Sequence, residues 1–365
     1  RMSLNSQPFV GAMNLSIGDV CLGRPLRAQP LAHERSSVND HVVTGGSHRR
    51  VVGVVAEHVL VTTDGSIEAN RAIPLALSAI RACGNPRVTL LCVLTSKQGT
   101  PVHALESAMA RAHAEASLQR IAQEFPAPDR VTWLVAEGGA AEQIVHFVET
   151  HDVDLIVMAS HGSDESQTWQ MGGTTRKIVV SGLASVFVVP TDPERKSITS
   201  ILIPLDGSAR SECVLPMATK LAVTHDAELV LVHVVPKPDI MHRLPMGAHE
   251  RELTEELTRI HRERAEGYLA GVRERLVGRG LRTRSELLAD ANPGRAIEAF
   301  ASESSCDLIL MCAHGSGCNQ DERYGSITRR LIDSLVKPIW IVQDLPVGPM
   351  RHVQPQSGRS HAEHD

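Results

Sequence analysis

Aromatic residues are scarce in this sequence, at 3% of 365 residues, and positive charge is not in excess, since the formal net charge is −5. Proteins that bind single-stranded nucleic acid stack the bases on aromatic side chains. Proteins that bind nucleic acid or an anionic membrane through charge carry a basic surface field. We therefore expect neither nucleic acid nor a membrane among the partners of this protein.

Long apolar runs are also missing. A membrane-spanning helix needs ~20 consecutive apolar residues, and the longest candidates, such as 179–189, are typical of strands. The apolar pieces near the beginning are too short for the core of a signal peptide. The seven cysteines are an odd number without a secretory pattern, which favours reduced thiols buried as small hydrophobic residues. These features predict a soluble, cytoplasmic protein.

Common catalytic motifs are absent as well. No GxxxxGK[ST] segment occurs, which excludes a P-loop. No Ser-His-Asp or Cys-His arrangement can be argued from spacing, because the candidate bases never recur beside a nucleophile. We therefore predict no catalytic residues.

One stretch is present twice. Residues 307–326 read DLILMCAHGSGCNQDERYGS, and residues 154–173 read DLIVMASHGSDESQTWQMGG. His161 pairs with His314, and the flanking aspartates and glycines pair at the same separation. The chain is therefore a duplicated unit.

Each copy of this stretch has the order strand, glycine, loop, glycine, helix. In the second copy the apolar run 308–311 is too short for a helix and suits a strand buried on both faces of a parallel sheet. Gly315 then lets the backbone turn and lets a ligand approach it closely. Gly325 and Ser326 open a helix whose free N–H groups form a seat for an anion. This order suggests a nucleotide site.

The alternation of strands and helices predicts two α/β domains. We assign one domain to residues 51–190 and another to residues 200–345, joined by a linker at 191–199. Residues 1–50 lack sustained periodicity and residues 346–365 are polar, so both are predicted to be disordered. Alternating strands and helices form a parallel sheet covered on both faces by right-handed crossovers. Ligands bind such sheets at the carboxyl ends of the strands.

Helical spacing over 67–82 and 212–223 predicts one helix after the first strand of each half. A Pro- and Met-rich loop at 236–249 has no counterpart in the first half, so we interpret it as an insertion.

These motifs resemble the universal stress protein family in its tandem two-domain form. The second half carries PLDGS, VLVHVV, DLILMCAHG and GSITRRLIDSLVKPIWIV, and the first half carries TTDGS, DLIVMASHG and GGTTRKIVVSGLASVFVV. The resemblance implies two five-stranded parallel sheets of the adenine-nucleotide alpha-hydrolase-like, Rossmann-like type. Some members of this family bind ATP and others do not.

The ATP-binding members are recognised by the motif Gly-x2-Gly-x9-Gly-(Ser/Thr), of which the second half keeps more than the first. Cys312 and Ala159 stand where the motif has its first glycine, and Gly173 stands where it has Ser or Thr. The resemblance assigns the ribose and phosphate side of a site to Cys312, Gly315, Gly325 and Ser326 in the second half, and to Ala159, Gly162 and Gly172 in the first.

The same resemblance assigns the adenine side to a second group of residues. Asp206 and Asp64 would contact the base, and the backbones of Val234 and Val93 would bind its edge. A simpler alternative is that each aspartate only forms an Asp-Gly-Ser turn and caps the next helix.

Acidic residues follow the first matching glycine in both loops, as Asp164-Glu165 and Asp321-Glu322. Carboxylates near a polyphosphate repel it unless a metal ion lies between them. The resemblance implies ATP as the cofactor, and Mg²⁺ would accompany it where these loops face the phosphates. His161 and His314 are expected to fix the loops by hydrogen bonding rather than to catalyse.

Three functions remain open. The first is a stress-response module that binds adenine nucleotide and has regulatory output through an unknown protein partner. The second is a protein–protein scaffold that needs no nucleotide, and the third is a slow, weak ATP hydrolase. The resemblance places the last strands, 186–189 and 339–342, at the sheet edges. We expect them to pair antiparallel as an intramolecular pseudo-dimer, with further homodimerisation left open.

Overall fold

The computed structural model describes residues 56–94, 101–162, 171–191, 197–236, 248–317, 322–335 and 337–344. The predicted N-terminal arm and C-terminal tail lie outside these residues. The loop carboxylates Asp164, Glu165 and Asp321 also lie outside them, as does most of the predicted insertion. Among the described residues, no helix has both the length and the apolar character needed to cross a membrane.

Strands and helices alternate along the first half, as predicted. Its elements are β1 (His58–Thr63), α1 (Ile67–Arg71), α2 (Ile73–Arg81), β2 (Arg87–Leu94), α3 (Pro101–Gln123), β3 (Val131–Glu137), α4 (Ala140–Thr150), β4 (Leu155–Ala159), α5 (Gly173–Ser181) and β5 (Ser185–Val189).

The second half repeats this order. Its elements are β6 (Ser200–Pro204), the 3-10 helix η2 (Ser211–Val214), α6 (Leu215–His225), β7 (Glu228–Pro236), α7 (Ala248–Val277), β8 (Thr283–Asp290), α8 (Pro293–Glu303), β9 (Leu308–Cys312), α9 (Ser326–Ser334) and β10 (Ile339–Val342).

The helix predicted after each first strand is interrupted. In the first half it breaks at Ala72, where α1 ends and α2 begins with Pro74 in its first turn. In the second half the 3-10 helix η2 precedes α6, which has Pro216 in its first turn. Proline lacks a backbone N–H and starts a helix better than it continues one, which explains both interruptions.

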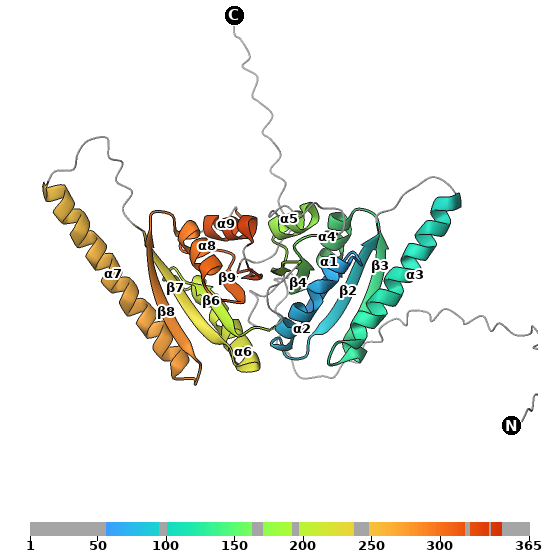
Figure 1. Ribbon diagram of the computed structural model, residues 1–365, viewed down its shortest axis with the longest axis horizontal. Coiled ribbons are helices and arrows are strands. Elements are labelled where there is room, and N and C mark those ends of the chain that lie inside the picture. The colour runs from blue at the N-terminus through green and yellow to red at the C-terminus, as the bar shows by residue number, and fades with distance from the viewer. Residues whose placement is uncertain are drawn as a thin grey trace, which may run out of the picture. The chain divides into compact units, whose positions relative to one another are not determined.

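The strands form one ten-stranded sheet in the order β3-β2-β1-β4-β5-β10-β9-β6-β7-β8. Within each half neighbouring strands are parallel, and each half has the same internal order. Figure 1 shows the long helices α3 and α7 beside the outer strands β3 and β8. The fold class predicted from the sequence is confirmed.

The two halves meet through β5 and β10, which pair antiparallel. Phe187 lies opposite Trp340 in this register, and their rings stack with centroids 5.4 Å apart. Both side chains are almost fully buried, at 0% and 1% exposed. The prediction that the last strands pair across a pseudo-two-fold axis is confirmed.

Helices cover both faces of the sheet and bury two apolar cores. One core packs α2, α3, α6 and α7 against the sheet, and the other packs α4, α5, α8 and α9 against the opposite face. Because the inner strands are buried on both faces, they consist of continuous apolar runs, whereas the outer strands β3 and β8 are partly exposed and carry polar residues. This arrangement leaves the ends of the strands as the places where polar side chains can gather.

The repeated aspartates before β4 and β9 hold the amino ends of β1 and β6. Asp154 Oδ2 accepts hydrogen bonds from the backbone N–H groups of Glu57 and His58, each at 2.9 Å. Asp307 Oδ2 accepts bonds from the backbone N–H groups of Thr199 and Ser200 and from the Thr199 hydroxyl. These two aspartates lie at the amino ends of the strands, whereas the candidate site lies at the carboxyl ends. Both copies of the repeat therefore have an aspartate here for a structural reason.

We predict that Trp340→Ala lowers the free energy of unfolding by about 3–5 kcal/mol, because it empties a buried site between the two halves. Trp133→Ala is the matched control, since Trp133 lies on the outer strand β3 and is 42% exposed. Guanidinium unfolding followed by far-UV circular dichroism measures both losses. Equal losses for the two variants would contradict the importance of the β5–β10 contact.

Candidate functional site

The second half has a pocket of about 330 Å³ at the carboxyl ends of β6, β7 and β9. The first turn of α9 and the beginning of α8 complete its wall. All six residues that the sequence assigned to this half line the pocket: Asp206, Val234, Cys312, Gly315, Gly325 and Ser326. Their assignment as ligand contacts stays a prediction.

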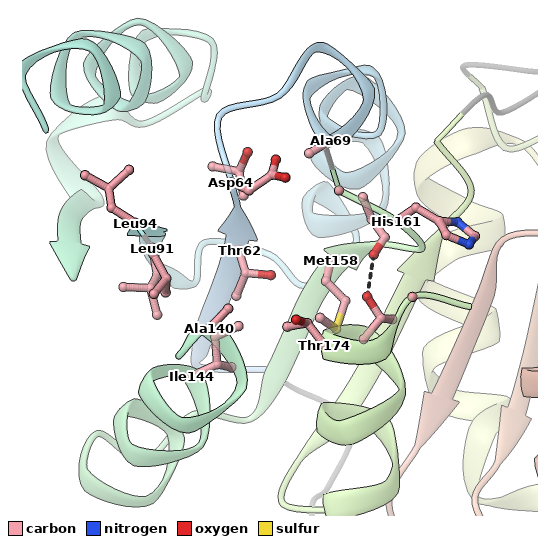
Figure 2. Close-up of a pocket in the computed structure, with 16 residues that line it drawn as sticks. Thr62, Asp64, Ala69, Leu91, Leu94, Ala140, Ile144, Met158, His161 and Thr174 are labelled. Carbon is pink, nitrogen blue, oxygen red and sulfur yellow. Dashed lines mark hydrogen bonds between the residues drawn. The ribbon is translucent and has the colours of Figure 1, made fainter. Parts of the chain in front are cut away.

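The first half has a corresponding pocket of about 270 Å³. Figure 2 shows labelled side chains around it that come from β1, β2, α4 and β4, among them Thr62, Leu91, Ile144 and Met158, together with Asp64 directly after β1. The five residues that the sequence assigned to this half also line the pocket: Asp64, Val93, Ala159, Gly162 and Gly172.

Asp206 is held in place by hydrogen bonds at the end of β6. Its Oδ1 accepts bonds from the Ser208 hydroxyl at 2.6 Å and from the Ser208 backbone N–H at 3.0 Å. Its Oδ2 accepts a bond from the backbone N–H of Ser316 at 2.6 Å. Burial alone would raise the pKa of Asp206, but these hydrogen bonds to the ionised form outweigh it and lower the pKa to about 2.

The glycine after β9 lies directly against this carboxylate. A Cβ added to Gly315 would lie 2.3 Å from Asp206 Oδ2, and a Cβ added to Gly162 would lie 2.3 Å from Asp64 Oδ2. Real atoms do not approach so closely, so a side chain at either glycine would displace the carboxylate of its own half. The two halves therefore share one contact between the end of their first strand and the end of their fourth.

The Asp-Gly-Ser turns have the predicted shape, but a different residue caps the helix. Gly65 and Gly207 have φ of +79° and +85°, a conformation that glycine adopts without strain. Asp64 Oδ1 accepts a hydrogen bond from the backbone N–H of Ser66, and the Ser66 hydroxyl accepts one from the N–H of Ala69. Ser66 is thus the N-cap of α1, and Asp64 forms the turn before it.

The beginning of α9 faces the pocket. Gly325 is its N-cap, and within the described residues no side chain caps this helix. The first three residues of α9, Ser326, Ile327 and Thr328, line the pocket. The nearest atoms to a Cβ on Gly325 would be 3.7 Å away, so packing does not require glycine there. Uncapped N–H groups and a positive helix end attract anions.

In each half a threonine fixes the helix after the glycine loop, α9 or α5, to the end of a strand. The sequence did not predict this contact. Thr328 Oγ1 donates to the carbonyl of Cys312 at 3.2 Å, and Thr175 Oγ1 donates to the carbonyl of Ala159 at 2.9 Å. The signal was present in the repeat, because both segments have threonine three residues after the motif's last glycine.

His314 holds the pocket loop by hydrogen bonding. Its Nδ1 lies 2.7 Å from Asp344 Oδ1, and its Nε2 donates to the carbonyl of Glu322 at 2.8 Å. Arg210 in turn donates to the other oxygen of Asp344 at 2.7 Å. His161 in the first half lies 3.0 Å from the Ser160 hydroxyl, and its ring points away from the other labelled side chains (Figure 2).

Further pocket residues came from outside the motif. His233 lies on β7, and its Nδ1 donates to the carbonyl of Leu205 at 2.8 Å. Pro293 and Ile297 form an apolar wall at the beginning of α8. The strand pattern identified the backbone of β7 but could not show which side chains face a cavity.

One carboxylate of the acidic loop, that of Glu322, belongs to the described residues. Glu322 lies 3.4 Å from Arg329 in an exposed ion pair. Arg323 packs at the junction of the halves, where a side chain on Gly182 would collide with it. Among the residues that the structure describes, no cluster of three or more His, Cys, Asp or Glu side chains could hold a metal ion.

We predict that Gly315→Ala lowers the free energy of unfolding by about 1–3 kcal/mol, because the new methyl group displaces the Asp206 carboxylate from its donors. Gly317→Ala is the matched control in the same loop, where an added Cβ meets nothing within 4 Å, and its effect should stay within about 0.5 kcal/mol. Urea unfolding compares the two. A harmless Gly315→Ala would refute the required contact.

Comparisons with known proteins agree with this geometry. The model of the "Universal stress protein family" matches residues 56–190 and again residues 197–343. Universal stress protein MJ0577 of Methanocaldococcus jannaschii is 25% identical over 156 residues, which are 39% of this chain and 93% of that protein.

Solved structures show the same fold. A universal stress protein from Archaeoglobus fulgidus has a TM-score of 0.54 at 17% identity, covering 79% of this chain and 99% of that chain. The functionally unknown protein PA1789 from Pseudomonas aeruginosa has a TM-score of 0.53 at 14% identity, covering 79% and 92%. With two matches that together span most of the sequence, the chain belongs to the universal stress protein family, as a tandem of two family domains.

Proposed function

We propose that the second half binds ATP and that the protein is a stress-response module with regulatory rather than catalytic output. The observation that carries this proposal is the gathering of the six motif residues around one pocket at the beginning of α9. In this proposal the module acts in the cytoplasm, through a protein partner that is not yet known.

The residues present fit a nucleotide. The base would lie against the apolar wall of Val234, Ile297 and Pro293. Val234 lies beyond the end of the β6–β7 pairing, whose last pair is Pro204 with Val232, so β6 does not pair with the backbone of Val234. The phosphates would lie over Gly325 and Ser326, because a glycine that packing does not need leaves the backbone open to a ligand. The pocket volume of about 330 Å³ lies within the range of small-molecule sites.

The first half is the weaker candidate. Its helix α5 begins with Gly173, which offers no hydroxyl where α9 has Ser326. Its pocket is also smaller, at about 270 Å³ against about 330 Å³. We therefore assign the tighter site to the second half.

One observation favours the alternative of a scaffold that needs no nucleotide. The Asp206 carboxylate already accepts bonds from Ser208 and Ser316, so a ligand would have to share or replace them. Acid extraction of the purified full chain, followed by chromatography of the extract, separates the two functions. An extract that contains adenine nucleotide in a stoichiometric amount supports the nucleotide-binding module. An extract without nucleotide, together with no binding of added ATP, supports the scaffold that needs no nucleotide.

We predict that Ser326→Ala weakens ATP binding about tenfold to a hundredfold, because a hydrogen bond to a charged acceptor is worth about 1.5–3 kcal/mol. Ser326→Thr keeps the hydroxyl and should retain most of the affinity. Ser334→Ala, at the other end of α9, is the control for the helix itself. Calorimetric titration of the full chain measures all three, and an unchanged affinity in Ser326→Ala would place the phosphates elsewhere.

We also predict that a divalent ion strengthens ATP binding more than AMP binding. Asp321 and Glu322 follow the glycine loop in sequence, and carboxylates near three phosphates repel them more than they repel one. Titrations with Mg²⁺ and with a chelator compare the two nucleotides. Equal ATP affinity under both conditions would show that the acidic loop does not face the phosphates.

A further inference from the structure

Two thiols of the second half lie against each other beside the pocket. The sulfur atoms of Cys213 and Cys312 are 3.1 Å apart, although the residues are 99 positions apart in the sequence. Cys213 lies on the short helix η2 and is partly exposed, whereas Cys312 is the last residue of β9 and is buried. Both are free thiols.

This pair is specific to one half. The equivalent positions in the first half are Arg71 and Ala159, so no thiol faces another there. The other described cysteines, Cys83, Cys92 and Cys306, are all buried. Burial raises the pKa of Cys83 to about 12 and that of Cys92 to about 11, so neither forms a thiolate near neutral pH.

We propose that Cys213 and Cys312 are a redox modification site, which hydrogen peroxide or another hydroperoxide converts into an intramolecular disulfide. A disulfide has a sulfur–sulfur distance of about 2.05 Å, so the two sulfur atoms must move about 1 Å closer. Disulfides that form in reducing compartments are usually transient and serve catalysis or redox sensing.

The reaction balances without a further partner. The Cys213 thiol gives up its proton, its sulfur attacks one peroxide oxygen, and the O–O bond breaks to leave a sulfenic acid. The departing oxygen takes up that proton and leaves as water, or as an alcohol when the oxidant is an organic hydroperoxide. The Cys312 sulfur then attacks the sulfenic sulfur and the S–O bond breaks. The released hydroxide takes the Cys312 proton, so two thiols and one hydrogen peroxide give one disulfide and two waters.

The structure divides the two roles. Cys213 is the side chain that solvent reaches, so it meets the oxidant first. The hydrogen bond to Cys213 and then burial raise the pKa of Cys312, and its burial shields it from an oxidant in solution. Cys312 is thus the resolving thiol.

The disulfide would join two walls of the pocket. Ser211, on η2, donates through its hydroxyl to the carbonyl of Ser208 and accepts a bond from the N–H of Asp206. Cys312 is part of the strand end that leads to Gly315. The bridge therefore ties the Asp206 turn to β9. It requires no nucleotide, so it stands or falls independently of the proposed function.

The test uses the reduced full chain without nucleotide. Peroxide treatment, alkylation of the remaining thiols with N-ethylmaleimide and peptide mass spectrometry should give one cross-linked pair, Cys213 with Cys312, and dithiothreitol should reverse it. Cys312→Ala, which places in β9 the residue that its equivalent β4 carries, should leave Cys213 as a sulfenic acid that dimedone traps. Cys306→Ala is the matched control and should still form the bridge.

Two outcomes would overturn the proposal. One is that both cysteines react with N-ethylmaleimide in denaturant after a peroxide dose that oxidises a free thiol in the same solution. The other is that Cys213 bridges to a different cysteine in the folded chain. Cys213→Ser gives a second measurement that does not alter β9: Cys312 should then stay reduced, and its oxidation at the wild-type rate would contradict the assigned order.

Discussion

The antiparallel pairing of β5 with β10 is the interaction on which the rest of this structure depends. Each half alone would expose an apolar edge strand, and such an edge invites aggregation. The pairing turns both edges into the centre of one sheet and buries Phe187 against Trp340. It also gives the two halves a fixed relation, in which each pocket is built from its own strands and helices alone.

Carboxylates define both ends of the strands in each half. At the amino ends of the strands, Asp154 and Asp307 hold the beginning of the first strand of their own half. At the carboxyl ends, Asp64 and Asp206 lie against a glycine that follows the fourth strand of their own half. The second contact shapes the candidate site, because it holds together two chain segments that line the pocket. A residue that looks like a ligand contact in the sequence is therefore first a structural requirement of its own pocket.

The strands and most helices could be predicted because buried parallel strands need continuous apolar runs and because the repeat gave each element twice. The break at Ala72 was missed, since helical spacing continues through it and only Pro74 signals the new start. The motif located the pocket wall at Gly325 and Ser326. It could not show the contacts of His314 with Asp344 or of Cys213 with Cys312. These partners are far apart in the sequence and meet only when the strands pair and the helices pack.

The covalent joining of the halves has a consequence for how this protein can change. In a symmetric homodimer every substitution appears in both subunits, so neither site can depart from the other. Here Cys312 and Asp344 lie in one half while Ala159 and Thr191 occupy the same positions in the other. Because both halves belong to one chain, a substitution in one half need not occur in the other. The two pockets of a single polypeptide can therefore differ in their residues.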